Sequence, residues 1–253
     1  MEEISFFRRS LRVSPPPSFQ LVESLRRQIT RLENGRRAEE STLISSGCKG
    51  LDCFLPEGGF RCGSLVEWLA GEAGCGAQSL AMLVAREACR EGGRLVVFDR
   101  AEQFYPPAAV RLGIEPDRLL VVRPENQADE LWALTQTLRC PGVAAVVAKL
   151  DTLESHDFRR LQLAAESHTA LGLLLRPWSV RREPSWAEVR LGVEAASSTE
   201  SAEIRRFKIH LLRSRRGAGY GTVEVELHEE AHPVRLVARL ARPQTDARSG
   251  RVV

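Results

Sequence analysis

Apolar residues in the middle of the chain fall into short runs separated by helical patterns. Runs rich in valine and leucine, a composition typical of strands buried on both faces, occur at 65–69, 95–98, 119–122, 143–148 and 170–175. Apolar positions at three- and four-residue spacing occur between them, at 80–88, 131–138 and 158–165. Repeated strand and helix units of this kind predict an α/β fold with a doubly wound, mostly parallel sheet and helices on both faces.

The pattern changes after Arg176. The segments RRFKIHLLRSRR, GTVEVELHE and VRLVARL alternate apolar and polar residues and contain no helical run. The glycines between the first two segments can supply a turn. We therefore expect an antiparallel extension of the same sheet. Strand alternation places Arg206 and Lys208 on one face of its first strand and Phe207 and Ile209 on the other.

The two ends of the chain differ from this middle part. Pro15, Pro16 and Pro17 block helix formation, and an amphipathic helical pattern follows, with apolar residues at Leu21, Leu25, Ile29 and Leu32. This arm can pack on its own domain or dock on another chain. The last residues lack apolar periodicity. We predict an N-terminal arm at 1–40, a core domain at 41–240 and a disordered tail at 241–253.

Composition narrows the functional classes only slightly. The 253 residues are 43% hydrophobic and 27% charged, and the net charge of +3 is too small to indicate a nucleic-acid partner by itself. No apolar run reaches the length of a membrane span and the N-terminus lacks a signal-peptide core, so we expect a cytoplasmic protein with no membrane partner. The six cysteines show no zinc-ligand spacing, which predicts reduced, mostly buried thiols and no metal site.

A glycine-rich turn follows the strand at 65–69. The sequence GEAGCGAQ has the glycine spacing of a phosphate-binding loop, with Gly71, Gly74 and Gly76 in place. Ala77 occupies the position of the lysine that neutralises phosphate charge, and Gln78 that of the hydroxyl that holds Mg²⁺. Loss of the lysine alone weakens binding about tenfold to a hundredfold. We predict a degenerate loop, weak or absent ATP binding and no cofactor.

Three segments carry a family resemblance. STLISSGCKGLDCFLPEGGFRCGSLVEWLAG is similar to the entry into the RecA recombinase core, and AAVRLGIEPDRLLVVRPENQADELWAL and RRLQLAAESHTALGLLLRP resemble the ImuA-like group of degenerate RecA-related proteins. The resemblance covers about three quarters of the chain. It implies a RecA-like fold from Thr42 to roughly Leu236.

The resemblance also shows where the catalytic positions have changed. The family's metal-side carboxylate corresponds to Lys149, and Asp151 could replace it only if the strand continued that far. The family's water-activating glutamate corresponds to Ala101, with Glu102 one residue out of phase. Together with the altered loop, these departures predict that the protein is not an enzyme.

Basic segments form the other candidate site. RPWSVRREPSW replaces the recombinase's longer DNA-contacting loop, and Arg213 and Arg215 resemble its paired lysines. Arginines beside tryptophans suit single-stranded nucleic acid, whereas the same tryptophans can instead pack on the sheet edge. The candidate DNA-binding or partner-binding surface comprises Arg176, Trp178, Arg181, Arg182, Trp186, Arg206, Lys208, Arg213, Arg215 and Arg216.

The resemblance implies a non-catalytic accessory protein of damage-induced, error-prone translesion DNA synthesis. Its implied partners are an inactive Y-family polymerase homologue and an error-prone replicative-type polymerase, with RecA and single-stranded DNA as further candidates. A SulA-like inhibitor of cell division, acting on FtsZ, is the alternative from another class. A weak DNA-dependent ATPase recombinase is a third, disfavoured by Ala77, Gln78 and Lys149.

Overall fold

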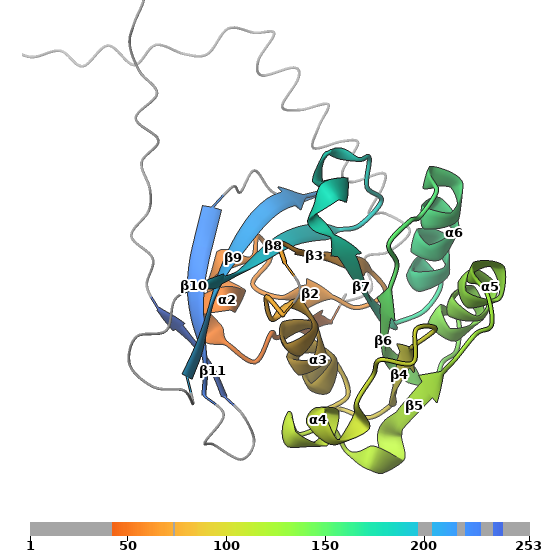
Figure 1. Cartoon of the computed structure of the whole chain (residues 1–253), viewed down its shortest axis with the longest axis horizontal. Coiled ribbons are helices and arrows are strands. Elements are labelled where there is room, and N and C mark those ends of the chain that lie inside the picture. The colour runs from red at the N-terminus through yellow and green to blue at the C-terminus, as the bar shows by residue number, and fades with distance from the viewer. Residues whose placement is uncertain (1–41, 73, 197–203, 217–220, 229–234, 240–253) are drawn as a thin grey trace, which may run out of the picture. The chain divides into compact units, whose positions relative to one another are not determined.

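The computed structural model describes residues 42–72, 74–196, 204–216, 221–228 and 235–239; the predicted N-terminal arm and C-terminal tail lie outside them. These residues form one large sheet with the strand order β11-β10-β9-β8-β3-β7-β6-β4-β5 (Figure 1). Its strands are β3 (Leu65–Ala70), β4 (Arg94–Phe98), β5 (Leu119–Val122), β6 (Val143–Lys149), β7 (Leu171–Pro177), β8 (Val189–Ala196), β9 (Ile204–Ser214), β10 (Gly221–His228) and β11 (Arg235–Arg239). Short strands β1 (Leu43–Ile44) and β2 (Phe60–Arg61) pair separately.

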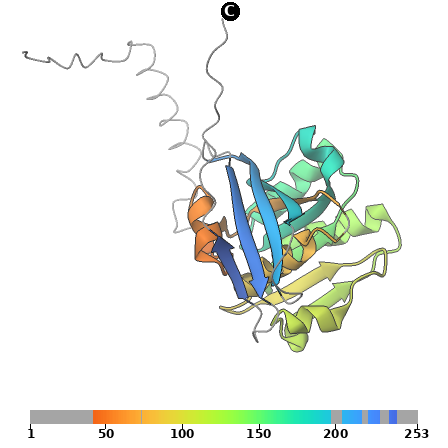
Figure 2. The same cartoon turned by 60° about the vertical axis from the view of Figure 1, so that its left-hand side comes forward.

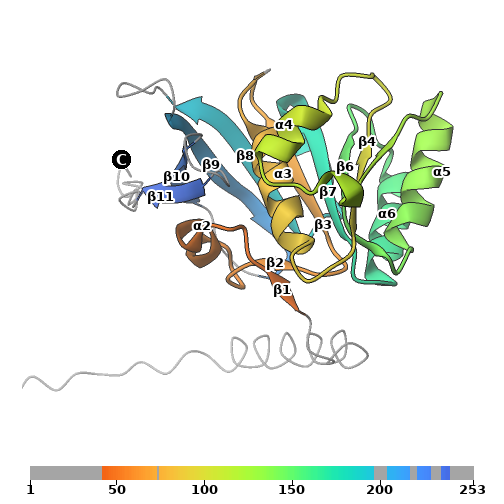
Figure 3. The same cartoon turned by 90° about the horizontal axis from the view of Figure 1, so that it is seen from below.

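Helices cover both faces of the parallel part, as predicted. They are α3 (Ala77–Ala88), α4 (Pro106–Arg111), α5 (Gln127–Leu138) and α6 (Ser155–Glu166). The short helix α2 (Lys49–Phe54) instead packs against β10 and β11, and 3-10 turns are formed at η1 (Pro116–Arg118) and η2 (Trp178–Arg182). Figure 3 shows α3 and α4 on one face and α5 and α6 on the other. Two hydrophobic clusters result, one packed around α3 and one beneath α5 and α6. None of the helices described here is long and apolar enough to cross a membrane.

The strand pairing changes from parallel to antiparallel at β8, a strand that the sequence patterns did not predict. β8 runs parallel to β3 and antiparallel to β9. From β9 onward the strands pair antiparallel, side by side in the foreground of Figure 2. The predicted fold class is thereby confirmed. The predicted alternation in β9 is confirmed as well, because Phe207 and Ile209 are buried in the α3-side cluster while Arg206 and Lys208 lie on the other face.

The cysteines follow the prediction in part. All six are free thiols, and Cys48 and Cys75 are buried, but Cys53 and Cys140 are exposed. Burial raises the pKa of the half-buried Cys89 thiol to about 11, so this thiol stays protonated at neutral pH. Across the residues described, no group of three His, Cys, Asp or Glu side chains could hold a metal ion.

Candidate functional site

The glycine-rich turn between β3 and α3 keeps the backbone shape of a phosphate-binding loop. Gly74 and Gly76 have φ values of 77° and 91°, a left-handed conformation that side chains disfavour, and Gly76 is the N-cap of α3. Ala77 is the first residue of the helix and is buried, and Gln78 is exposed. The helix N-terminus is therefore present, but no cationic side chain projects from the first turn of the helix.

Gly76 is also fixed by a neighbour distant in sequence. A Cβ atom on Gly76 would lie 2.1 Å from Cε1 of Phe207, a core residue of β9. The guanidinium of Arg205 lies 5.8 Å from the centre of the same ring. The loop thus depends on the antiparallel extension for its packing, which sequence spacing could not indicate.

A cavity of about 850 Å³ opens beside this loop. Its walls come from the loop, the carboxyl ends of β4, β6 and β7, helix α4, the start of η2 and Arg205 of β9. Lys149 and Asp151 both line it and both are exposed. The strand β6 ends at Lys149, so the continued strand that Asp151 would need to replace a metal-side carboxylate is not formed. Glu102 has a φ of 54° and is not among the lining residues.

Asp99 is the buried carboxylate of this cavity, and the sequence analysis did not single it out. Its Oδ1 accepts a hydrogen bond of 2.8 Å from the backbone N–H of Gln103, and its Oδ2 lies 3.6 Å from Nε of Arg123. Both interactions hold the turn after β4. Ala77 in the loop and Lys149 at the strand end do not fit Mg²⁺-bound ATP, because one supplies no charge and the other repels the metal.

A second polar group lies inside the sheet, around Glu67 in the middle of β3. Glu67 Oε1 accepts a 3.0 Å bond from Arg176, and Oε2 accepts bonds of 2.6 Å from Arg190 and 2.5 Å from the Ser185 hydroxyl. All four residues are buried. A charged residue within the apolar run LVEWLA was the available signal for this cluster. Arg176 was predicted to lie on an exposed surface, and that prediction is wrong, because it is drawn inward to pair with Glu67.

The two tryptophans of the basic segment pack against the protein. A Cβ atom on Gly192 would lie 2.4 Å from Trp178, so this ring rests directly on β8. Trp186 packs against the cluster beneath α6, and its Nε1 donates a 3.2 Å bond to the Ser155 hydroxyl. The packing alternative therefore describes the half-buried tryptophans better than an exposed stacking platform does.

The basic residues in the middle of β9 are paired with carboxylates. Arg206 lies 2.9 Å from Glu226, and Lys208 lies 3.8 Å from Glu224. Both pairs follow from the register of β9 against β10. Their positive charges are compensated on the sheet surface. The basic surface predicted from the sequence is therefore not one continuous patch of uncompensated charge.

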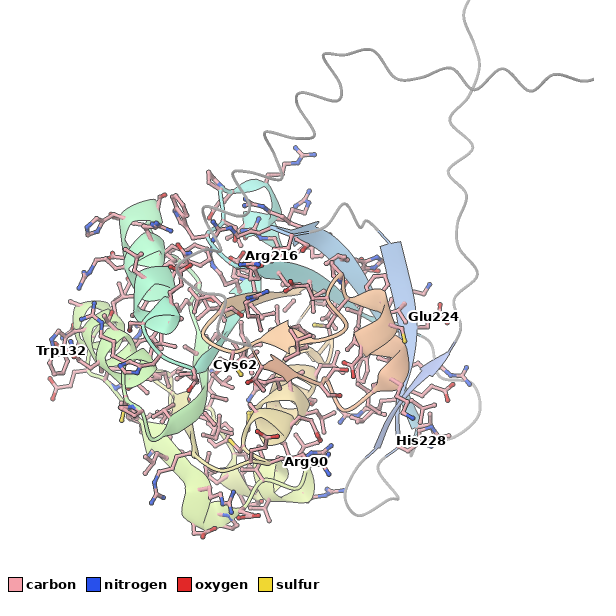
Figure 4. All side chains as sticks on the ribbon, turned by 180° about the vertical axis from the view of Figure 1, so that it is seen from behind. Cys62, Arg90, Trp132, Arg216, Glu224 and His228 are labelled. Carbon is pink, nitrogen blue, oxygen red and sulfur yellow. The ribbon has the colours of Figure 1, made fainter. Side chains whose placement is uncertain are left out.

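The remaining arginines lie where η2 and the end of β9 come together. Arg181 and Arg182 are exposed on η2, and Arg213 and Arg215 are exposed at the end of β9. Arg216, next along the chain, forms a 2.9 Å ion pair with Glu188. In Figure 4, Arg216 lies well away from Glu224 and His228 on β10. The structure thus brings part of the predicted set together and separates Arg206 and Lys208 from it.

Comparison with known proteins agrees with this architecture. The family model for the RecA N-terminal domain matches residues 24–153. ImuA of Caulobacter vibrioides strain NA1000 is 29% identical over 232 residues, which cover 83% of this chain and 94% of that protein. RecA of Chlorobium limicola is 32% identical over 131 residues, 50% of this chain and 37% of that protein. The chain belongs to the RecA N-terminal domain family and, within it, is an ImuA-like protein.

Proposed function

We propose that the protein is a non-catalytic accessory factor of damage-induced, error-prone translesion DNA synthesis. The similarity to ImuA over 94% of that protein supports this role and favours it over inhibition of cell division. The proposed partners are an inactive Y-family polymerase homologue and an error-prone replicative-type polymerase. RecA and single-stranded DNA are further candidate partners.

The altered nucleotide site supports the proposal that the protein does not hydrolyse ATP. Ala77 offers no charge to a γ-phosphate, and exposed Gln78 offers no hydroxyl to Mg²⁺. Lys149 stands where a carboxylate would hold the metal side of the site. ATP hydrolysis depends on positioned charge in such folds, so three replaced groups leave too little stabilisation of the transition state.

Phosphate release with and without single-stranded DNA tests this part. We expect no turnover above a Gln78→Asp control, which places a carboxylate at the phosphate position yet favours the helix N-terminus of α3. A change at Gly76 is unsuitable as a control, because any side chain there would collide with Phe207. Turnover that Gln78→Asp removes would overturn the non-catalytic proposal.

A genetic experiment tests the biological role. Deleting the gene should lower the frequency of damage-induced mutations, and both the wild-type and the Gln78→Asp copy should restore it. Restoration by wild type alone would point to a nucleotide-dependent function. A deletion without effect on mutation frequency would contradict the proposed role itself.

A further inference from the structure

Four exposed arginines lie on two segments that contact each other, and we call them the arginine surface: Arg181 and Arg182 on η2, and Arg213 and Arg215 at the end of β9. Contacts hold the two parts together. Arg213 donates a 2.6 Å bond to the Ser185 carbonyl in the segment that follows η2. The backbone N–H of Arg215 donates a 2.9 Å bond to the carbonyl of Glu188 in the same segment.

Buried groups fix the shape of this surface. Arg190 lies directly opposite Arg213 in the β8–β9 register. Its Nη1 donates to the carbonyls of Arg181 at 3.0 Å and Glu183 at 2.9 Å, while its Nε is held by Glu67. η2 is therefore wrapped around a buried guanidinium. The surface is organised before any partner arrives, which lowers the ordering cost of binding.

The charges of the arginine surface are not compensated by the residues that the structure describes. Within the part of the chain that the structure describes, no carboxylate lies within 4.0 Å of the four guanidinium groups. The nearby acids are engaged elsewhere, Glu183 with Arg176 at 3.4 Å and Glu188 with Arg216 at 2.9 Å. Arginine forks of this kind match carboxylates and phosphates equally well.

The packing of the two tryptophans favours protein carboxylates over the phosphates of single-stranded nucleic acid as the ligand. Trp178 lies against β8 at Gly192 and Arg181 lies 5.8 Å from its ring centre, while Arg159 lies 4.7 Å from the ring centre of Trp186. Bases of a single strand gain about 1–3 kcal/mol each from stacking on open aromatic faces. Trp178 packs on β8 and borders the cavity beside the glycine-rich loop, and Trp186 packs on the cluster beneath α6, so the arginine surface offers charge but no fully open aromatic face.

We propose that the arginine surface binds an acidic segment of a partner protein through its carboxylates. This inference rests on the proposed function, since it names the chemistry of one protein partner of the accessory factor. The four exposed guanidiniums fit a run of glutamates or aspartates better than they fit stacked nucleotides. Association should be fast and salt-sensitive, as for other complementary charged surfaces.

Fluorescence anisotropy with the full-length protein tests the proposal. The probes are a fluorescein-labelled peptide of alternating glutamate and glycine, and labelled oligo(dT) of equal charge. Arg181→Ala with Arg182→Ala should weaken peptide binding by about tenfold. The matched control, Arg206→Ala with Lys208→Ala, removes the same net charge from compensated positions and should change it by less than about twofold.

The same titrations can overturn the proposal. Oligo(dT) that binds more tightly than the peptide, quenches tryptophan fluorescence and depends on Arg181 and Arg182 would identify a nucleic-acid surface. Equal losses in the two double variants would show that only net charge matters. Unchanged peptide binding in the Arg181→Ala, Arg182→Ala protein would also contradict the proposal.

Mutation frequency separates failure of this inference from failure of the proposed function. In the deletion strain, the wild-type copy should restore damage-induced mutation and the Arg181→Ala, Arg182→Ala copy should not. If both copies restore mutation, the inference about the arginine surface is contradicted and the proposed accessory role still stands. If neither copy restores mutation although the wild-type protein is present at normal levels, the proposed accessory role is contradicted.

Discussion

The middle of β9 and the arginine surface have similar sequences and different electrostatics. In β9, Arg206 and Lys208 each face a glutamate of β10, and His210 lies 3.5 Å from Glu194 of β8. At the arginine surface, the guanidiniums have no carboxylate partner among the described residues. Arginine density along a chain therefore does not identify a binding surface. The register of the neighbouring strands shows which of the charges are compensated.

Strand register explains where compensation stops. The last pair between β9 and β10 joins Leu211 to Gly221, so β9 residues beyond Leu211 have no β10 partner in this ladder. On the β8 side, Arg213 faces Arg190, which is already bound to Glu67. The end of β9 thus carries the same residue types as its middle, but it lies beyond the reach of the glutamates of β10.

The largest expected effect comes from the buried support beneath η2. Glu67→Gln would leave Arg176 and Arg190 as buried cations without their shared carboxylate, and breaking a buried pair in this way costs about 3–5 kcal/mol. We expect that loss in the free energy of unfolding, measured by urea denaturation. Glu224→Gln is the control, because its pair with Lys208 is exposed and should contribute less than about 1 kcal/mol. Equal losses in both variants would show that Glu67 does not support η2 in this way.

Removing the facing carboxylates should give the middle of β9 the uncompensated charge of the arginine surface. Glu224→Gln with Glu226→Gln removes the carboxylates facing Lys208 and Arg206, so the middle of β9 should gain affinity for the glutamate peptide. A gain of about threefold to tenfold is expected, since an ion pair near the surface, such as Lys208–Glu224, contributes about 0.2–1 kcal/mol. High salt should abolish it.

Exposed glutamates elsewhere provide the control for that conversion. Glu91→Gln with Glu125→Gln raises the net charge equally and faces no strand cation in any described ion pair. A similar gain in this protein would mean that overall charge, and not strand register, determines binding of the peptide.

The sequence was sufficient for most of the parallel sheet and for the loop. The strands near 65–69 and 143–148 are formed as predicted, because their apolar patterns match burial directly. β8 was missed although Val189, Leu191 and Val193 alternate with Arg190 and Gly192 in a strand pattern. Tertiary contacts require both residues, because Arg190 binds Glu67 and Gly192 leaves room for Trp178. Helix α4 was missed where two prolines open it.

The sites were less predictable because they join residues distant in sequence. Spacing identified Ala77 and Gln78 as departures within the loop, but not the contact of Phe207 with Gly76. Likewise, the pattern placed Arg206 and Lys208 on one strand face without showing which residues of the next strand would face them. A one-residue change of register would have reversed the outcome for these two side chains.

The smallest predicted difference lies between two single substitutions in β9. The side chains of Arg206 and Glu226 are 11% and 15% exposed, so Arg206→Ala should lower the free energy of unfolding by about 0.5–1 kcal/mol. Arg215→Ala should leave it unchanged within error, because that exposed side chain makes no ion pair with the described residues. Urea denaturation of both proteins checks the difference, and binding of the glutamate peptide should show the opposite order. If Arg215→Ala lowers stability more than Arg206→Ala does, then Arg215 is used within the fold and the arginine surface is smaller than the four residues assigned to it.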